Sequence, residues 1–217
     1  MLILPGSNAL SAFRNQRLLS QLQAVAPAIT AVQARFYHFI DTSAPLSAED
    51  TGRLDAMLTY GEPFVGQKAE GAAEEFFVIP RLGTISPWAS KATDIAHNCG
   101  MAHVHRIERG VAYTVFLKGG LLGSSLGAAK ALNAAETEAV AALLHDRMTE
   151  AVFAERDAAA RLRAQVAAES RRIAATSAGL ADAQQRLGAL DARVNARLTE
   201  LRRSQDELVR TRIRLTR

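Results

Sequence analysis

The chain has 217 residues, of which 48% are hydrophobic and 22% charged, a composition typical of a folded globular protein. Its single cysteine excludes an intramolecular disulfide and fits a reducing cytosol. No apolar run reaches the ~18 residues that a membrane-spanning helix needs, and the first residues lack the basic start of a signal peptide. We therefore expect a cytoplasmic protein without membrane contact.

The net charge of +4 is unevenly distributed along the chain. Residues 156–217 contain 14 arginines, no lysine and 7 acidic residues, whereas residues 1–155 contain 12 basic and 15 acidic residues. The same C-terminal segment has no proline and no aromatic residue. This break in composition predicts a domain over residues 1–155 and a separate tail over 156–217.

The first domain reads as strand, helix, strand, helix, and then repeats this order. Short apolar runs at 2–4 and 75–80 end at a proline, as strands often do, and the aromatic and β-branched runs at 32–40 and 104–117 also indicate strands. Residues 7–25 have apolar side chains at a helical period. Ser47 and Asn133 suit helix N-caps, and Glu136 completes a capping-box pattern with Asn133.

A shift of 75 positions superimposes the two halves. It aligns residues 2–13 with 77–88 and residues 33–40 with 108–115, and a further insertion aligns 47–61 with 133–147. Self-similarity at a fixed offset indicates an internal duplication. The predicted class is α+β, a duplicated strand-helix-strand-helix unit with a mostly antiparallel sheet of ferredoxin-like or split βαβ halves.

The tail is predicted to form a long α-helix or a coiled coil. Apolar residues recur every seven positions from Val166 to Leu215, over about 75 Å of helix. The second seam position is poorly filled, because it holds Thr176, Ala183, Leu190, Arg197, Ser204 and Thr211. Glycines 179 and 188 each weaken a helix by roughly 1 kcal/mol.

Several residues suggest chemistry, and each has a simpler interpretation. His97 and Cys99 would point apart on a helix, which favours a small packed cysteine over a nucleophilic pair. His103 and His105 share a strand face but lack an evident third zinc ligand. The glycine-rich run at 118–130 lacks both common phosphate-binding spacings, so we expect a connection there.

Residues 83–100, GTISPWASKATDIAHNCG, pack many functional groups into one stretch. Ser86 and Pro87 suit the start of a helix, and Trp88 corresponds to Phe13 in the other half, so we expect a core anchor. The residues that follow would form a polar helix face. Charges also alternate at 106, 108 and 109, and they form either a solvated face or an ion-pair surface for another domain.

The segment PRLGTISPWASKATDIAHNCG, followed by VHRIERGVAYTV, resembles large-type phosphoribosylformylglycinamidine synthases. LPGSNALSAFRNQRLL and LLHDRMTEAVF are also similar to that family, so the resemblance covers about residues 1–155. It implies the N-terminal domain of a glutamine-dependent, ATP- and Mg²⁺-using ligase of purine biosynthesis. The family's catalytic motifs lie in later regions, so no catalytic or cofactor-binding residue is expected in this chain.

What the resemblance implies is a scaffold that joins the synthetase and glutaminase modules so that ammonia passes between them, in a truncated form without activity of its own. The expected docking surface comprises Arg81, Thr84, Ser86, Trp88, Ser90, Lys91, Asp94, Arg106 and Arg109.

The tail does not resemble the family, and a native helix, a fusion and a frameshift are alternative origins. The alternative function is therefore a coiled-coil interaction protein that self-associates through the tail, with the domain as a cap. Nucleic-acid binding is not expected, since the arginines are interspersed with acids and no aromatic residue is present to stack on bases.

Overall fold

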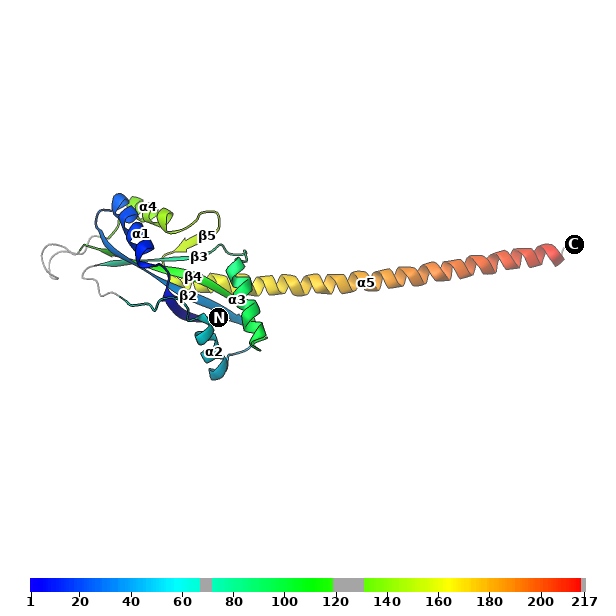
Figure 1. Ribbon diagram of the computed structural model, residues 1–217. Helices are drawn as coiled ribbons and strands as arrows, with labels where there is room; N and C mark the ends of the chain where they lie inside the picture. The colour runs from blue at the N-terminus through cyan, green and yellow to red at the C-terminus, as the bar shows by residue number, and fades with distance from the viewer. Residues whose placement is uncertain (67–71, 119–130, 216–217) are drawn as a thin grey trace. The chain divides into compact units, whose positions relative to one another are not determined.

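A computed structural model describes residues 1–66, 72–118 and 131–215 of the chain (Figure 1). The chain forms two compact units, the first from Met1 to Ala167 and the second starting at Ala168. The elements alternate along the chain: β1 (Leu2–Asn8), α1 (Ala12–Val25), β2 (Ile29–Thr42), α2 (Ala48–Leu58), β3 (Ala73–Pro80), α3 (Pro87–Asn98), β4 (Val104–Leu117), α4 (Ala134–Leu144), β5 (Glu150–Phe153) and α5 (Arg156–Leu215).

The described part of the first unit contains a five-stranded sheet in the order β1-β2-β4-β3-β5, in which every neighbouring pair is antiparallel. The α+β class predicted from the sequence is confirmed. At the centre, Phe36 of β2 is paired with Val111 of β4. These two residues correspond under the 75-residue shift, so the two halves of the duplication meet around this pair.

The connections explain how consecutive elements reach this order. Helix α2 connects β2 to β3, and these two strands run parallel to each other with β4 between them. Helix α4 connects β4 to β5, which also run parallel, with β3 between them. Each connection is a split βαβ unit. The first of them joins the two halves, whereas within each half the strands, β1 with β2 and β3 with β4, are antiparallel neighbours, so the halves themselves are not the split βαβ units that were predicted. Each half of the duplication therefore donates a strand to the middle of the sheet, which ties the two halves into one fold.

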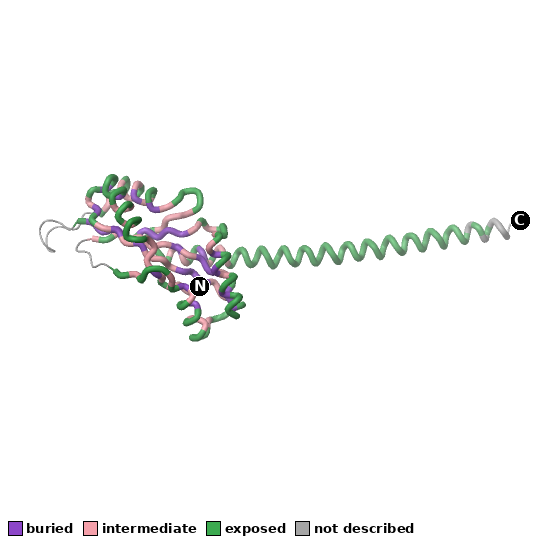
Figure 2. The backbone as a smooth tube through the Cα atoms, in the orientation of Figure 1, coloured by how far each residue is buried: buried purple, intermediate pink, exposed green. Residues whose placement is uncertain are grey.

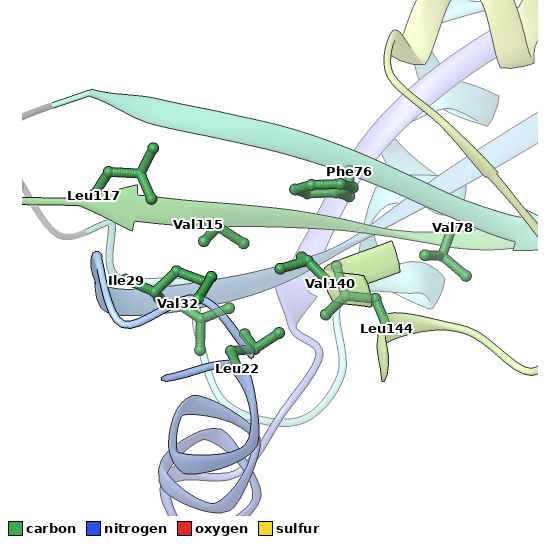
Figure 3. Close-up of a cluster of buried hydrophobic side chains, with 10 residues drawn as sticks. Leu22, Ile29, Val32, Phe76, Val78, Val115, Leu117, Val140 and Leu144 are labelled. Carbon is green, nitrogen blue, oxygen red and sulfur yellow. The ribbon is translucent and has the colours of Figure 1, made fainter. Parts of the chain in front are cut away.

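Helices α1 to α4 cover one face of the sheet. Val32 and Val115, a register pair, contact Leu22 of α1 and Val140 of α4 in one apolar cluster (Figure 3). Further along the same strands, the pair Ile40 and Ile107 belongs to a second cluster that also contains residues of α2 and α3. Since side chains alternate between faces along a strand, both clusters lie on the same face.

The opposite face of the sheet packs against the first turns of α5. Phe39, Phe77 and Ile79 form a buried cluster with Ala159 of that helix. Gly110 lies on the same face, where a Cβ atom would approach the Val78 carbonyl oxygen at 3.0 Å and Cγ2 of Ile79 at 2.8 Å. The beginning of α5 is thus part of the first unit and contributes to its core.

Each of the helices α1 to α4 begins at a side-chain cap. Ser11, Ser47, Ser86 and Asn133 each accept a hydrogen bond from the backbone N–H three residues later. Asn133 and Glu136 form the complete capping box that the sequence predicts. Ser86 is followed by Pro87 in the first turn of α3, which confirms the predicted start of that helix.

Three features differ from expectation. β5 follows α4 and was not predicted, because its four residues carry too weak a pattern. β1 continues through Pro5 to Asn8, which the sheet tolerates because β1 is an edge strand with irregular register there. Phe13 is 75% exposed, whereas Trp88 is partly buried against the second cluster, so the two residues are not structural counterparts.

The second unit, taken by itself, is the remainder of α5. Its side chains are exposed along the helix wherever the structure describes them (Figure 2). The exposed residues include the apolar heptad series Ile173, Leu180, Leu187, Val194, Leu201 and Leu208. Among the described residues, none of the helices combines the length and apolar character required to span a bilayer.

Candidate functional site

The predicted docking residues lie on or beside α3, but on two sides of the sheet. Ser90, Lys91 and Asp94 are exposed on α3, which confirms its predicted polar face. Trp88 and Arg109 lie on the face that the helices cover. The remaining members, Arg81, Thr84, Ser86 and Arg106, surround the segment that leads into α3.

On the helix-covered face, Arg109 is enclosed by aromatic rings. Its Nη1 donates to the Tyr60 hydroxyl at 3.0 Å, and its Cζ lies 4.7 Å from the ring centroid of Trp88 and 4.3 Å from that of Phe36. The Tyr60 hydroxyl lies 3.1 Å from Nε2 of His38, whose ring stacks on Trp88 at 5.6 Å. We call these five residues the aromatic cluster. Cation–π contacts and hydrogen bonds together fix the Trp88 ring under α3.

His38 is neutral in this cluster. Burial, and then the positive charge of Arg109, lower the pKa of His38 from 6.5 to about 4. Since Arg109 donates to the Tyr60 oxygen, the Tyr60 O–H can donate to the unprotonated Nε2 of His38. The chain of hydrogen bonds therefore runs from the guanidinium through the phenol to the imidazole.

A small cavity of about 160 Å³ opens beside the aromatic cluster, between α2 and α3. Its lining is mostly apolar, and Lys91 contributes the charged group. The lining residues are Met57, Leu58, Tyr60, Trp88, Lys91, Ala92 and Ile95. A pocket of this size can hold one apolar side chain beside the ammonium group of Lys91.

On the opposite face of the sheet, Glu108 is buried in an ion cluster. Its Oε2 accepts from Nη1 of Arg163 at 2.9 Å and lies 3.2 Å from Nη2 of Arg106. Its Oε1 accepts from the Ser86 hydroxyl at 3.2 Å. Nη2 of Arg163 donates to the Pro80 carbonyl at 2.8 Å. These contacts connect α5, β4, β3 and the start of α3.

Arg163 is 7% exposed, and burial lowers its pKa while the charge of Glu108 opposes that shift. Glu108 is 2% exposed. A buried carboxylate is tolerated only when cations and hydrogen-bond donors surround it, and here it has two arginines and a hydroxyl. The ion cluster is therefore a structural joint. Arg106 and Glu108 of β4 form internal ion pairs on the face that packs against α5 of the same chain, whereas Arg109 lies on the other face.

The loop before α3 is fixed to this joint. Nη2 of Arg106 donates to the Thr84 carbonyl at 2.6 Å, and the Thr84 hydroxyl donates to the Arg81 carbonyl at 2.6 Å. Thr84, Ser86 and Arg106 thus hold the loop in place through internal hydrogen bonds. The part of the predicted surface that a partner can reach then comprises the exposed residues of α3, the cavity and Arg81, whose side chain is also exposed.

The histidines and the cysteine that suggested chemistry in the sequence lie near the end of α3 and in the segment that follows it. A ring nitrogen of His97 lies 2.6 Å from the Val104 carbonyl oxygen, and Cys99, the α3 C-cap, is exposed rather than packed as expected. His103 lies 3.5 Å from Asp50. Within the described ranges, no group of three or more His, Cys, Asp or Glu side chains is placed to hold a metal ion. Most of the glycine-rich run lies outside the described residues.

Four members of these clusters were not predicted from the sequence: Phe36, His38, Tyr60 and Arg163. Tyr60 follows α2 in an irregular segment without periodicity, and His38 lies in the aromatic and apolar run FYHFI of β2. Arg163 was assigned to the tail by composition. A signal for it existed, because Ala159 and Arg163 are one helical turn apart and could share a face toward the domain.

These features define a class of protein: an internally duplicated α+β domain whose antiparallel sheet has helices α1 to α4 on one face and the start of α5 on the other. Comparison with protein families identifies it further. Residues 35–162 match the family described as formylglycinamide ribonucleotide amidotransferase N-terminal, and the chain belongs to this family. The family resemblance seen in the sequence is confirmed. The match extends into α5, in agreement with the packing of its first turns.

Replacement of Arg163 tests the ion cluster. Arg163→Met leaves Glu108 buried with one cation fewer, so the free energy of unfolding should fall by about 3–5 kcal/mol. Urea unfolding followed by Trp88 fluorescence measures this change. Arg161→Met, an exposed arginine on the same helix, is the matched control and should cost less than ~1 kcal/mol. Equal unfolding midpoints for the two variants would contradict the assignment.

Protonation of His38 should destabilise the fold in acid. Between pH 6.5 and about 4 the unfolded chain binds a proton that the folded chain does not, so the free energy of unfolding falls as the pH falls. The loss should total about 3 kcal/mol over this window. We expect unfolding curves of the wild type and His38→Gln to diverge there, whereas the exposed His105→Gln follows the wild type. Parallel curves for His38→Gln would refute the prediction.

Proposed function

We propose that residues 1–167 act as a non-catalytic docking domain of formylglycinamide ribonucleotide amidotransferase, the synthase of purine biosynthesis named by the sequence resemblance. Membership of the N-terminal family supports a role for this chain in that enzyme. The observation that carries the docking role is the exposed polar side of α3 beside the cavity and above the fixed Trp88 ring. The titratable groups of the two clusters are engaged in internal contacts, which supports a structural role for them.

The proposed partners are the synthetase and glutaminase modules of the same enzyme. The family uses ATP, Mg²⁺ and glutamine, and we assign their binding to those modules. The described residues of this chain do not fit a Mg²⁺ site, since they provide no cluster of carboxylates or other metal ligands. The proposed domain carries no catalytic step of its own, and it resides in the cytoplasm together with the pathway.

The partner surface should be acidic and apolar where it meets α3. The cavity accommodates one apolar side chain, and Lys91 at its wall favours a neighbouring carboxylate. The docking energy would then concentrate in one anchor residue placed against Trp88 and Met57, as is common at protein interfaces. This surface is narrower than the set predicted from the sequence, because Thr84, Ser86 and Arg106 make internal contacts instead.

A charge reversal at Lys91 tests the docking surface. We expect Lys91→Glu to weaken binding of the full chain to isolated synthetase and glutaminase modules by ~10-fold, measured by titration calorimetry. Arg17→Glu on α1, also exposed, should leave the affinity unchanged. Equal weakening by both variants would argue against the α3 surface. Synthase turnover by the pure chain, with glutamine, ATP and Mg²⁺ supplied, would contradict the non-catalytic assignment.

A second candidate function is self-association through the second unit. The specific observation is the heptad series from Ile173 to Leu208, in which more than half of each side chain is exposed. A helix of this length gains most of its stability from packing an apolar face, and its internal ion pairs, such as Arg172 with Glu169, contribute little each. A coiled coil would bury this series and is compatible with docking through α3.

A further inference from the structure

We infer that the second unit associates with a second copy of this chain as a parallel, in-register two-stranded coiled coil. This inference rests on the self-association proposed above and adds the orientation and register of the two helices.

In a coiled coil, the helices pack through two positions of each heptad, called a and d. In this helix, position a is consistently apolar, whereas position d is poorly filled. With Ile173, Leu180, Leu187, Val194, Leu201 and Leu208 as position a, each of these residues meets its own copy in a parallel, in-register pair. The d positions between them hold Leu190 and the smaller or polar residues Thr176, Ala183, Arg197 and Ser204. Leu190 and Val194 are adjacent seam residues, and with Leu198 and Leu201 they line an apolar surface hollow. This segment would form the tightest part of the pair.

The flanking charges favour the parallel orientation. In a parallel pair, each g residue faces the e residue five positions later in the other helix. Arg186 then faces Asp191, and Glu207 faces Arg212, so both pairs are attractive. The remaining g–e combinations from Arg172 to Gln205 contain no like-charged pair: Arg172–Ser177, Gly179–Gln184, Arg193–Leu198 and Glu200–Gln205.

An antiparallel pair with the same apolar overlap has unfavourable contacts. If the helices cross at residues 190–194, g positions face g positions and e positions face e positions. Arg193 then meets its own copy, and so does Asp191, which places like charges together at the centre of the pair. Arg186 with Glu200 is an attractive contact of this arrangement. Charge complementarity therefore selects the parallel arrangement.

Arg197 is the one charged d residue between Leu187 and Leu208. Its Nη1 donates to Glu200 Oε2 of the same helix at 2.8 Å, and 82% of its side chain is exposed. The long side chain can therefore keep its charge outside the seam, with the ion pair retained. A polar residue at one core position lowers stability but penalises shifted registers, which would bury it against leucine. In the in-register pair Arg197 also meets its own copy, a like-charge contact that weakens the pair, so the in-register alignment rests on the g–e pairs.

Disulfide trapping tests the orientation with the full chain. In a Cys99→Ser background, Leu180→Cys places two thiols opposite each other in the parallel pair, whereas Gln185→Cys points outward at position f. Sedimentation equilibrium is expected to give a dimer for the parent chain. Under a glutathione redox buffer, Leu180→Cys should cross-link at least ~10-fold faster than Gln185→Cys.

The alternative outcomes separate the orientation from the association itself. A monomer in sedimentation equilibrium would overturn both this inference and self-association as a function. A dimer that cross-links between Leu180→Cys and Ser204→Cys chains, and not through Leu180→Cys alone, would be antiparallel and would overturn only the orientation. A dimer that cross-links in neither combination would place the contact outside this seam. None of these results bears on docking through α3, which the Lys91→Glu titration tests separately.

Discussion

The antiparallel pairing of β2 with β4 is the constraint on which the rest of the domain depends. Each strand has 14 residues, and the pairing brings the two halves of the duplication together at Phe36 and Val111. Because side chains alternate along β4, Glu108 and Arg109 point to opposite faces of the sheet. Glu108 fixes the start of α5 on one face, and Arg109 organises the aromatic cluster under α3 on the other. One strand therefore positions both features that matter for the proposed function.

Local signals in the sequence predicted much of the fold. The strand runs, the serine and asparagine caps and the 75-residue shift gave the order of elements, and the shift also matched the pair at the centre of the sheet. Composition was less informative. The charge break near Glu155 suggested a boundary there, while the compact unit extends to Ala167 because Ala159 and Arg163 pack on the sheet. Average charge over a segment cannot show that one arginine is buried.

The candidate site could be predicted only in part, because the sequence does not show which elements contact each other. Periodicity shows that Arg106 and Glu108 share one strand face and Arg109 lies on the other, but not which element covers each face. The partner of Glu108 is 55 residues away, and the partner of Arg109 lies in an irregular segment. The exposed polar side of α3 was predictable, because a cap, a proline and helical spacing suffice to define it. The residues that make internal contacts could be separated from those that face outward only from their hydrogen bonds.

The central claim is that the domain docks through α3. Hydrogen exchange of the full chain, with and without the synthetase and glutaminase modules, tests it most directly, because it reports each segment of the domain at once. Docking through α3 predicts slower exchange in residues 87–98 and in the C-terminal half of α2 on binding, with α1 and α4 unchanged. Protection confined to α1 and α4, with α3 unaffected, would contradict it.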